Sequence, residues 1–80
     1  MAITLSDAIS ITIKEIRKRK GLSQEDLALI SGIDRTYISG IERKNRNPTI
    51  NSIEKITSAL EVSNSEFLSH AMENIKKWNT

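Results

Sequence analysis

The sequence contains no cysteine among its 80 residues, and it has one histidine, one proline and three glycines. Without cysteine the chain cannot form disulfide bonds or thiolate metal sites, and this composition fits a reducing cytoplasm. The single histidine, His70, cannot build a metal site alone. We therefore expect a cytoplasmic protein without a metal or other cofactor, with His70 at the surface or in an interface.

Long hydrophobic runs are also absent, since no apolar stretch approaches the ~20 residues needed to span a bilayer. The first 13 residues lack a leading basic segment, contain Asp7 and are followed by cations. A signal peptide has the opposite polarity. We expect a soluble, unexported protein that has no membrane partner.

The sequence lacks the residue combinations that most enzymes need. It has no nucleophilic cysteine, no histidine paired with a carboxylate at a usable spacing and no glycine-rich phosphate loop. A helical chain of this length also leaves little room for a substrate pocket. These absences predict a protein with no catalytic activity and no small-molecule substrate.

Charge is distributed unevenly along the chain. Residues 14–46 carry nine cations and five acids, a net charge of +4, whereas residues 47–80 have a net charge of −1. A basic half beside a slightly acidic half is typical of a protein with one face for a polyanion. Taken alone, this pattern favours a solvated surface of mixed charge.

Apolar residues recur at helical spacing throughout the chain, and no window alternates long enough to indicate a sheet. The pattern predicts an all-α fold, a compact five-helix bundle that forms a single domain over residues 1–80. The expected helices span about residues 7–20, 24–31, 35–43, 50–60 and 64–77. The inward-facing residues expected on the first four are Ile9, Ile13, Ile16, Leu27, Ala28, Ile30, Ile38, Ile41, Ile53, Ile56 and Leu60.

Residues that cap helices mark the predicted boundaries. Ser23 with Asp26 and Ser63 with Glu66 both match the capping box, in which two side chains each accept a backbone N–H bond. The full set of expected N-caps is Ser6, Ser23, Asp34, Thr49 and Ser63. The expected left-handed stops after the first two helices are Gly21 and Gly32.

Residues 23–43 have the layout of a helix-turn-helix. Ala28 is small enough to sit where two helices cross, and Gly32 tolerates the positive φ of a sharp turn. Ile33 and Ile38 can then wedge the two helices at a fixed angle. In such a pair the second helix enters the DNA major groove.

The first turn of this second helix holds the residues expected to contact base edges. Arg35 offers a planar fork that can bond O6 and N7 of guanine, and we expect it to be the main base reader. Thr36 can use its hydroxyl or pack its methyl against thymine. Tyr37 can contact a base or bond a phosphate through its hydroxyl.

Other residues around the helix-turn-helix are expected to contact the sugar-phosphate backbone. Gln24 opens the first helix of the pair, where backbone N–H groups and the helix dipole favour a phosphate. Ser39 lies one turn beyond Arg35, and Gly40 in mid-helix indicates close approach of another helix or of DNA. The expected cationic and amide contacts that complete the set are Arg17, Arg43, Lys44, Arg46 and Asn47, of which Arg46 can also reach a base.

The last helix has more apolar residues than one small core should need. A chain this short buries only about 60% of its unfolded surface, and small domains often gain stability from a partner subunit. Two-fold symmetry would also present two recognition helices to successive major grooves. We expect a homodimer formed partly by this helix, through Leu68, Met72, Ile75 and Trp78.

Four stretches of the chain resemble the phage-repressor-like helix-turn-helix family over about residues 8–68. They are LSQEDLA, the Gly32 turn, YISGIERKNRNPTI and IEKITSALEV. The string DRTYISGIERKNRN is closer still to the controller proteins of bacterial restriction–modification systems, which are small five-helix homodimers. The resemblance implies that the protein binds double-stranded DNA at a promoter operator beside the endonuclease gene, first activating that gene and repressing it at higher occupancy.

The resemblance also implies roles for single residues. It places the DNA contacts on Gln24, Arg35, Thr36, Tyr37, Ser39, Arg43 and Arg46. It further implies that Glu25 and Glu42 either lie near an edge that faces RNA polymerase or support arginines. Three alternatives stay open at this point: a phage-type repressor, the antitoxin of a toxin–antitoxin pair, and a protein-interaction module of the same fold that does not bind DNA.

Overall fold

The computed structural model describes residues 2–79, and all the regular structure in this range is helical. This confirms the predicted all-α, five-helix fold. The helices begin and end within two residues of the predicted bounds. They are α1 (Leu5–Arg19), α2 (Gln24–Ser31), α3 (Arg35–Glu42), α4 (Ile50–Leu60) and α5 (Asn64–Trp78).

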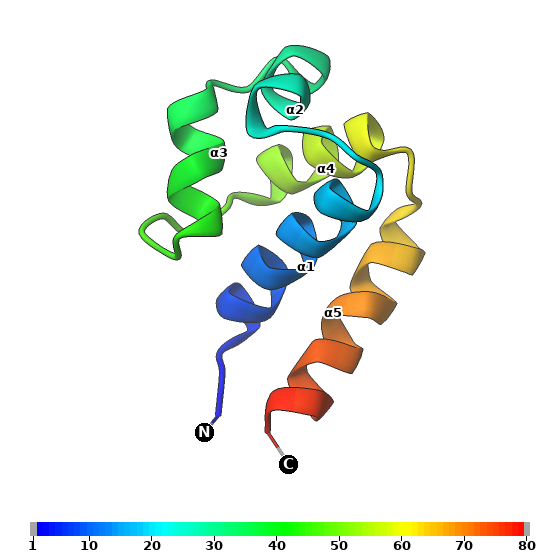
Figure 1. The fold of residues 1–80 in the computed structure, drawn as a ribbon. Helices are drawn as coiled ribbons and strands as arrows, with labels where there is room; N and C mark the ends of the chain where they lie inside the picture. Colours follow the sequence, from blue (N-terminus) through cyan, green and yellow to red (C-terminus); the bar gives the residue numbers. More distant parts are fainter. Residues whose placement is uncertain (1, 80) are drawn as a thin grey trace.

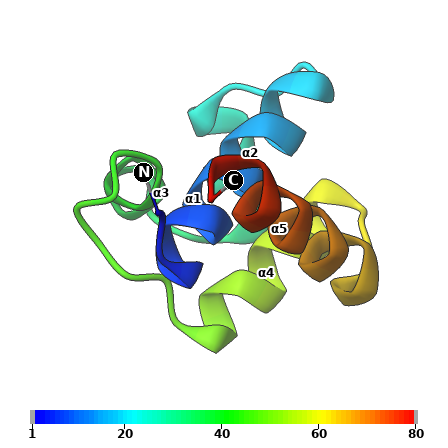
Figure 2. The same cartoon turned by 90° about the horizontal axis from the view of Figure 1, so that it is seen from below.

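Helix α1 lies in the middle of the molecule, between α3 on one side and α5 on the other (Figures 1 and 2). It runs antiparallel to α5, so both ends of the chain lie at the same end of the molecule (Figure 1). There the backbone N–H of Ile3 donates to Oδ1 of Asn79 at 2.8 Å. Helix α1 thus forms a supporting layer, with α3 on one side and α5 on the other.

The core between the helices is built from the predicted stripes. Ile13, Leu27, Ile38 and Ile56 are each at most 1% exposed. One prediction for this core is wrong: Ile30 lies on the outer side of α2 and is 58% exposed. Helix α2 has only eight residues, and its short inner face is filled by Leu27 with Ala28 beside it.

Capping follows the predicted chemistry at α2, α4 and α5. Both predicted capping boxes are present, and Oγ1 of Thr49 accepts the N–H of Ser52 at 3.0 Å. At α1 the cap is Thr4 and not Ser6, because Thr4 forms a complete capping box with Asp7. The spacing of these two residues matches the capping-box rule, so the sequence already contained this signal.

The N-terminus of α3 departs from the prediction. Asp34 precedes the helix, but its side chain accepts no capping hydrogen bond. Its backbone carbonyl instead receives the N–H groups of Tyr37 and Ile38 at 3.0 and 3.2 Å. The first turn of α3 is therefore held by backbone bonds and by the burial of Ile38.

The turn between α2 and α3 needs a residue that tolerates positive φ. Gly32 has φ of +73° and ψ of 16°, and its N–H donates to the carbonyl of Ala28 at 2.9 Å. A residue with a Cβ atom would be strained in this conformation, so the prediction for Gly32 is confirmed. Gly21, just after α1, has the same φ of +73°.

Within residues 2–79, no helix combines the length and apolar character that crossing a bilayer requires.

Candidate nucleic-acid interface

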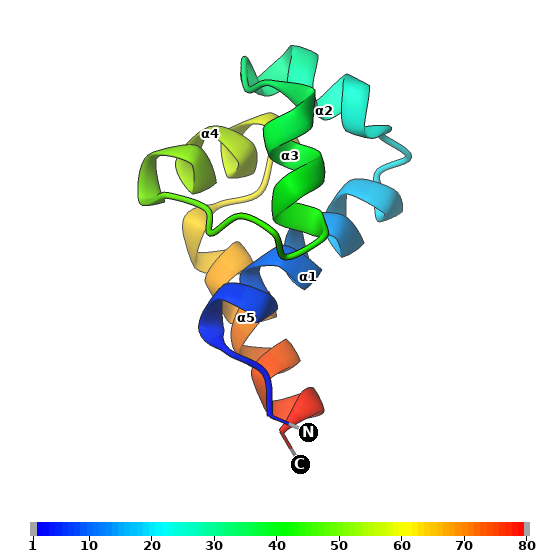
Figure 3. The ribbon, with the colours of Figure 1, turned by 90° about the vertical axis from the view of Figure 1, so that its left-hand side faces the viewer.

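Helix α3 forms one outer face of the molecule, with no helix in front of it in Figure 3. Ile38 and Ile41 are fully buried and fix this helix to α1 and α2. Helical geometry then turns the opposite side of α3 outward. Arg35 and Thr36, in its first turn, are both exposed. The structure thus places the two predicted base readers where a DNA groove can reach them.

Arg35 is held only loosely by the protein. Its Nε lies 3.9 Å from Oε1 of Glu25, and the two side chains are 59% and 76% exposed. An exposed ion pair at this distance contributes little to stability. The guanidinium therefore keeps its hydrogen-bonding edges available for a ligand.

Tyr37 of α3 and Arg46 of the loop after it form a stacked pair. The guanidinium carbon of Arg46 lies 5.3 Å from the centre of the Tyr37 ring, within the range of a cation–π contact. The Tyr37 hydroxyl lies 3.5 Å from Oγ of Ser52 on α4. The hydrogen bond with Ser52, aided by the charge of Arg46, lowers the pKa of Tyr37, with partial burial opposing. Sequence reasoning missed Ser52, since nothing in the pattern pairs it with α3.

Arg43, which directly follows α3, has a different partner from Arg46. Nη1 of Arg43 donates to Oγ of Ser39 at 2.6 Å, one helical turn earlier. Arg43 is exposed and Ser39 is half-buried. The two predicted phosphate contacts therefore lie together, and Ser39 holds the arginine at the surface.

Of the two approaches expected for Gly40, that of another helix is wrong, whereas that of DNA stays a prediction. A Cβ atom at this position would lie 3.1 Å from Cγ and 3.5 Å from Cδ of Arg46. The close neighbour is therefore the stem of a loop arginine, and not another helix. In the sequence, only the six-residue spacing between Gly40 and Arg46 indicates this contact, and sequence reasoning did not use it.

Arg17 requires a correction, because it is only 7% exposed and does not face solvent as a phosphate contact would require. Its Nε and Nη2 donate to the carboxylate of Glu42 at 2.7 and 2.8 Å, and its Nη1 donates to the carbonyl of Leu22 at 2.7 Å. The hydrogen bonds with Glu42 raise the pKa of Arg17, and burial opposes them. Arg17 joins α1 to α3 and to the turn before α2.

Gln24 belongs to the same cluster. Its Nε2 donates to Oε1 of Glu42 at 3.0 Å, and its side chain is half-buried. Of the two roles that the resemblance allows for Glu42, support of an arginine is the one that the structure shows. Glu42 thereby fixes the start of α2 against the end of α3.

The loop after α3 brings further cations toward α1. Lys44 has φ of +64° and lies with Lys14 and Lys18 around an open depression of about 360 Å³. Asn47 is exposed, and its Oδ1 accepts a hydrogen bond from Oγ of Ser6 at 3.0 Å. Lys14, Lys18 and Lys44 thus lie at one edge beside α3, where Glu15 and Glu42 also line the depression.

Comparison with known proteins supplies the family. The helix-turn-helix family model matches residues 13–67, which include α2, the Gly32 turn and α3. The chain belongs to the helix-turn-helix family.

Its relatives within this family include restriction–modification controller proteins. A crystal structure of the C.Esp1396I tetramer with its natural 35 base-pair operator is 51% identical, covers 91% of this chain and 96% of that chain, and has a TM-score of 0.87. Control protein C.BamHI of Bacillus amyloliquefaciens is 46% identical, over 70% of each chain. Control protein C.SmaI of Serratia marcescens is 39% identical, over 74% of this chain and 70% of its own.

Helix α5 packs against α1 and α4, and part of its outer side is apolar. Leu68 and Met72 are 52% and 53% exposed, Trp78 is 49% exposed and Ile75 is half-buried. Leu68 lines an apolar groove of about 340 Å³ with Leu5, Ile50 and residues of the core. Sequence reasoning missed Leu5 and Ile50, because neither lies on the buried stripe of its helix.

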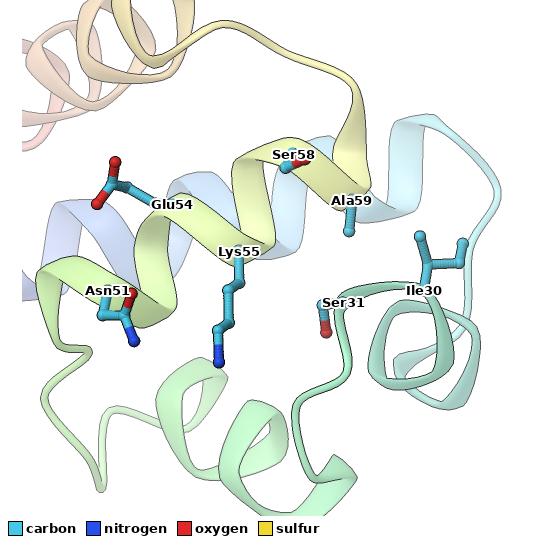
Figure 4. Close-up of a pocket in the computed structure, with 7 residues that line it drawn as sticks. All are labelled: Ile30, Ser31, Asn51, Glu54, Lys55, Ser58 and Ala59. Atoms are coloured by element: carbon cyan, nitrogen blue, oxygen red, sulfur yellow. The ribbon is translucent and has the colours of Figure 1, made fainter.

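A second depression, of about 420 Å³, lies between α2 and α4 (Figure 4). It is open and largely polar, and it contains the exposed Ile30 of α2 and Lys55 of α4. None of the predicted DNA-contacting residues lines it. Among the described residues, no group of three or more histidine or acidic side chains is placed to hold a metal ion.

Proposed function

We propose that this protein is a DNA-binding transcriptional regulator of the controller type. It binds a palindromic operator as a homodimer, and it activates or represses its own gene and that of an endonuclease. The observation that carries the proposal is the exposed first turn of α3, where Arg35 and Thr36 stand outward above the buried Ile38. Arginine at this position can recognise guanine through two parallel hydrogen bonds.

The backbone contacts are proposed to surround this first turn. Arg43 and Lys44 lie beyond the C-terminal end of α3, Ser39 lies in its last turns beside Arg43, and Gln24 lies at the start of α2. Cations at these places neutralise phosphates and set the register of the protein on the duplex. Asn47 completes the edge as an exposed amide.

The homodimer is proposed to form at the apolar groove between α1, α4 and α5. Leu5, Ile50 and Leu68 are 57%, 75% and 52% exposed, and Met72 continues the apolar surface one turn along α5. Exposed apolar side chains that cluster around a groove are a feature of protein–protein contact sites. A second copy of the chain is proposed to cover this groove, because a protein that binds a palindromic operator needs a two-fold axis.

Contact with RNA polymerase is proposed through Glu25. This carboxylate is 76% exposed on α2, beside the recognition helix. Glu42 is excluded from such a contact because its side chain is 2% exposed. A protein bound next to a promoter would thus present an acidic side chain at the edge of the duplex.

In vitro selection from random duplexes, followed by footprinting on the DNA upstream of the gene, tests the proposal. We expect enrichment of two half-sites related by a dyad and spaced by about 10 base pairs or a multiple of this. Binding should weaken with salt, with about 0.9 added to the slope of log K against log salt per phosphate neutralised. Failure to enrich any sequence would refute DNA recognition and leave a protein-interaction module as the function of the fold.

A further inference from the structure

The loop that follows α3 is anchored on the backbone of Gly40. The carbonyl oxygen of Gly40 accepts the N–H groups of both Asn45 and Arg46, at 2.8 and 3.2 Å. Lys44, with its φ of +64°, reverses the chain between the helix end and these two bonds. The loop therefore returns to the helix and brings the Arg46 side chain back over it.

The Arg46 side chain then crosses α3 directly above Gly40. The three atoms nearest to a Cβ atom at residue 40 would all belong to Arg46: Cγ at 3.1 Å, Cδ at 3.5 Å and Cβ at 3.7 Å. The guanidinium continues past Gly40 to the ring of Tyr37, three residues earlier on the helix. Gly40 and Tyr37 thus form a seat for Arg46, with the glycine under the stem and the ring under the charge.

We infer that Gly40 is a positioning residue for Arg46 in DNA recognition. This inference rests on the proposed function. A glycine inside a helix is unfavourable relative to alanine, so its presence here calls for a local reason. That reason is the aliphatic part of the Arg46 side chain, because only a residue without a Cβ atom leaves ordinary van der Waals space for it. An arginine side chain that is already held in place loses less conformational freedom on binding DNA than one that rotates freely.

The first test needs no DNA. In the free wild-type protein, the Tyr37 ring should shift upfield the proton resonances nearest the Arg46 guanidinium, those of Cδ and Nε, in the NMR spectrum. We expect Gly40→Ala to reduce this shift, since the added methyl group displaces the stem. Random-coil chemical shifts for the Arg46 side chain in the wild-type protein would overturn the inference without any variant.

The second test measures affinity for the duplex selected by the wild-type protein. Gly40→Ala should weaken binding roughly two- to tenfold, the equivalent of ordering one long side chain on binding. Its melting temperature should stay unchanged or rise by up to about 4–8 °C, because alanine favours the helix. A structural defect would instead lower affinity and melting temperature together, and this result would count against a positioning role.

The variants Arg46→Ala and Arg43→Ala provide matched backgrounds. Gly40→Ala should have no further effect on binding in the Arg46→Ala protein and its full effect in the Arg43→Ala protein. An equal loss in both backgrounds would show that Gly40 acts through something other than Arg46. If the wild-type protein selects no duplex, the proposed function fails, whereas the NMR test of the seat still stands.

Discussion

The carboxylate of Glu42 receives three hydrogen bonds from two other helices. Nε and Nη2 of Arg17 and Nε2 of Gln24 all donate to it, at 2.7 to 3.0 Å. Both members of the ion pair are nearly inaccessible to water, with side chains 8% and 2% exposed. Removing one member of such a pair leaves an uncompensated buried charge.

Replacement of Glu42 by alanine should therefore lower the free energy of unfolding by about 3–5 kcal/mol. Chemical denaturation measures this loss, which is a large share of the total stability of a small domain. The double variant Arg17→Met/Glu42→Leu removes both charges and should regain most of it. A loss below about 1 kcal/mol in the single variant would show that the pair is solvated.

In contrast to the buried pair of Glu42, the ion pair of Arg35 with Glu25 is exposed and long. Arg35→Ala should leave the melting temperature unchanged and relax base preference at one position in each half-site, by about 1–3 kcal/mol. Selection from random duplexes measures the preference. Arg43→Ala is the control, since loss of a phosphate contact weakens all sequences alike and flattens the salt dependence. Unchanged preference in Arg35→Ala would remove this residue from the base readers.

At the scale of the element, the ends of the helices depend on short side chains. Three capping boxes, at α1, α2 and α5, each satisfy two backbone N–H groups that a helix start leaves free. The box at α2 matters most for function, because it sets where α2 begins and therefore where Gln24 lies. There Oδ2 of Asp26 accepts the backbone N–H of Ser23 at 2.9 Å.

This hydrogen bond, together with that of the Ser23 hydroxyl, lowers the pKa of Asp26 below its ordinary value of 3.8. A carboxyl whose pKa is lower in the folded state stabilises the fold above the unfolded pKa and loses this effect as pH falls through the folded pKa. Asp26→Asn should therefore reduce the melting temperature above about pH 5. The difference from wild type should disappear on acidification below pH 3.8, as thermal unfolding monitored by circular dichroism can show. A difference that is constant with pH would assign the effect to shape and not to charge.

At the scale of the whole molecule, the proposed DNA-binding surface and the proposed dimer surface lie apart from each other. Helix α1 lies between α3 and α5, so the recognition helix and the last helix occupy different sides of one supporting layer (Figures 1 and 2). The apolar groove opens where the first turns of α1 and α4 meet α5. A partner copy can therefore cover the groove without covering the first turn of α3.

Leu68→Asp should shift the protein from dimer to monomer in analytical ultracentrifugation, because a carboxylate would be buried without a partner in the interface. DNA affinity should fall with it, since a monomer engages only one half-site. Leu29→Asp is the matched control: Leu29 is 84% exposed on α2, outside the groove. A Leu68→Asp protein that stays dimeric would exclude the groove as the interface.

Several features of this protein could be predicted from local sequence alone. The helix count, the two predicted capping boxes and the Gly32 turn depend on residues within about four positions of one another, where helical hydrogen bonding and backbone sterics act. The same local rules made the exposure of Arg35 predictable, because Ile38 and Ile41 mark the buried side of its helix. They also misplaced the start of α1, where Ser6 was predicted as the cap and Thr4 forms the capping box with Asp7.

The remaining features depended on contacts between residues distant in sequence. Arg17 looked like the other cations of its helix, and only its distance from Glu42, 25 residues away, separates a buried pair from a phosphate contact. Leu68 is brought together with Leu5 and Ile50 only when the helices pack, and Gly40 meets Arg46 only through the fold of the loop after α3. Local sequence determined where the chain turns and which side of each helix is apolar, because these follow from short-range sterics and hydrogen bonds. Tertiary structure decided which charges face water, because a neighbour's position sets the balance of desolvation and pairing.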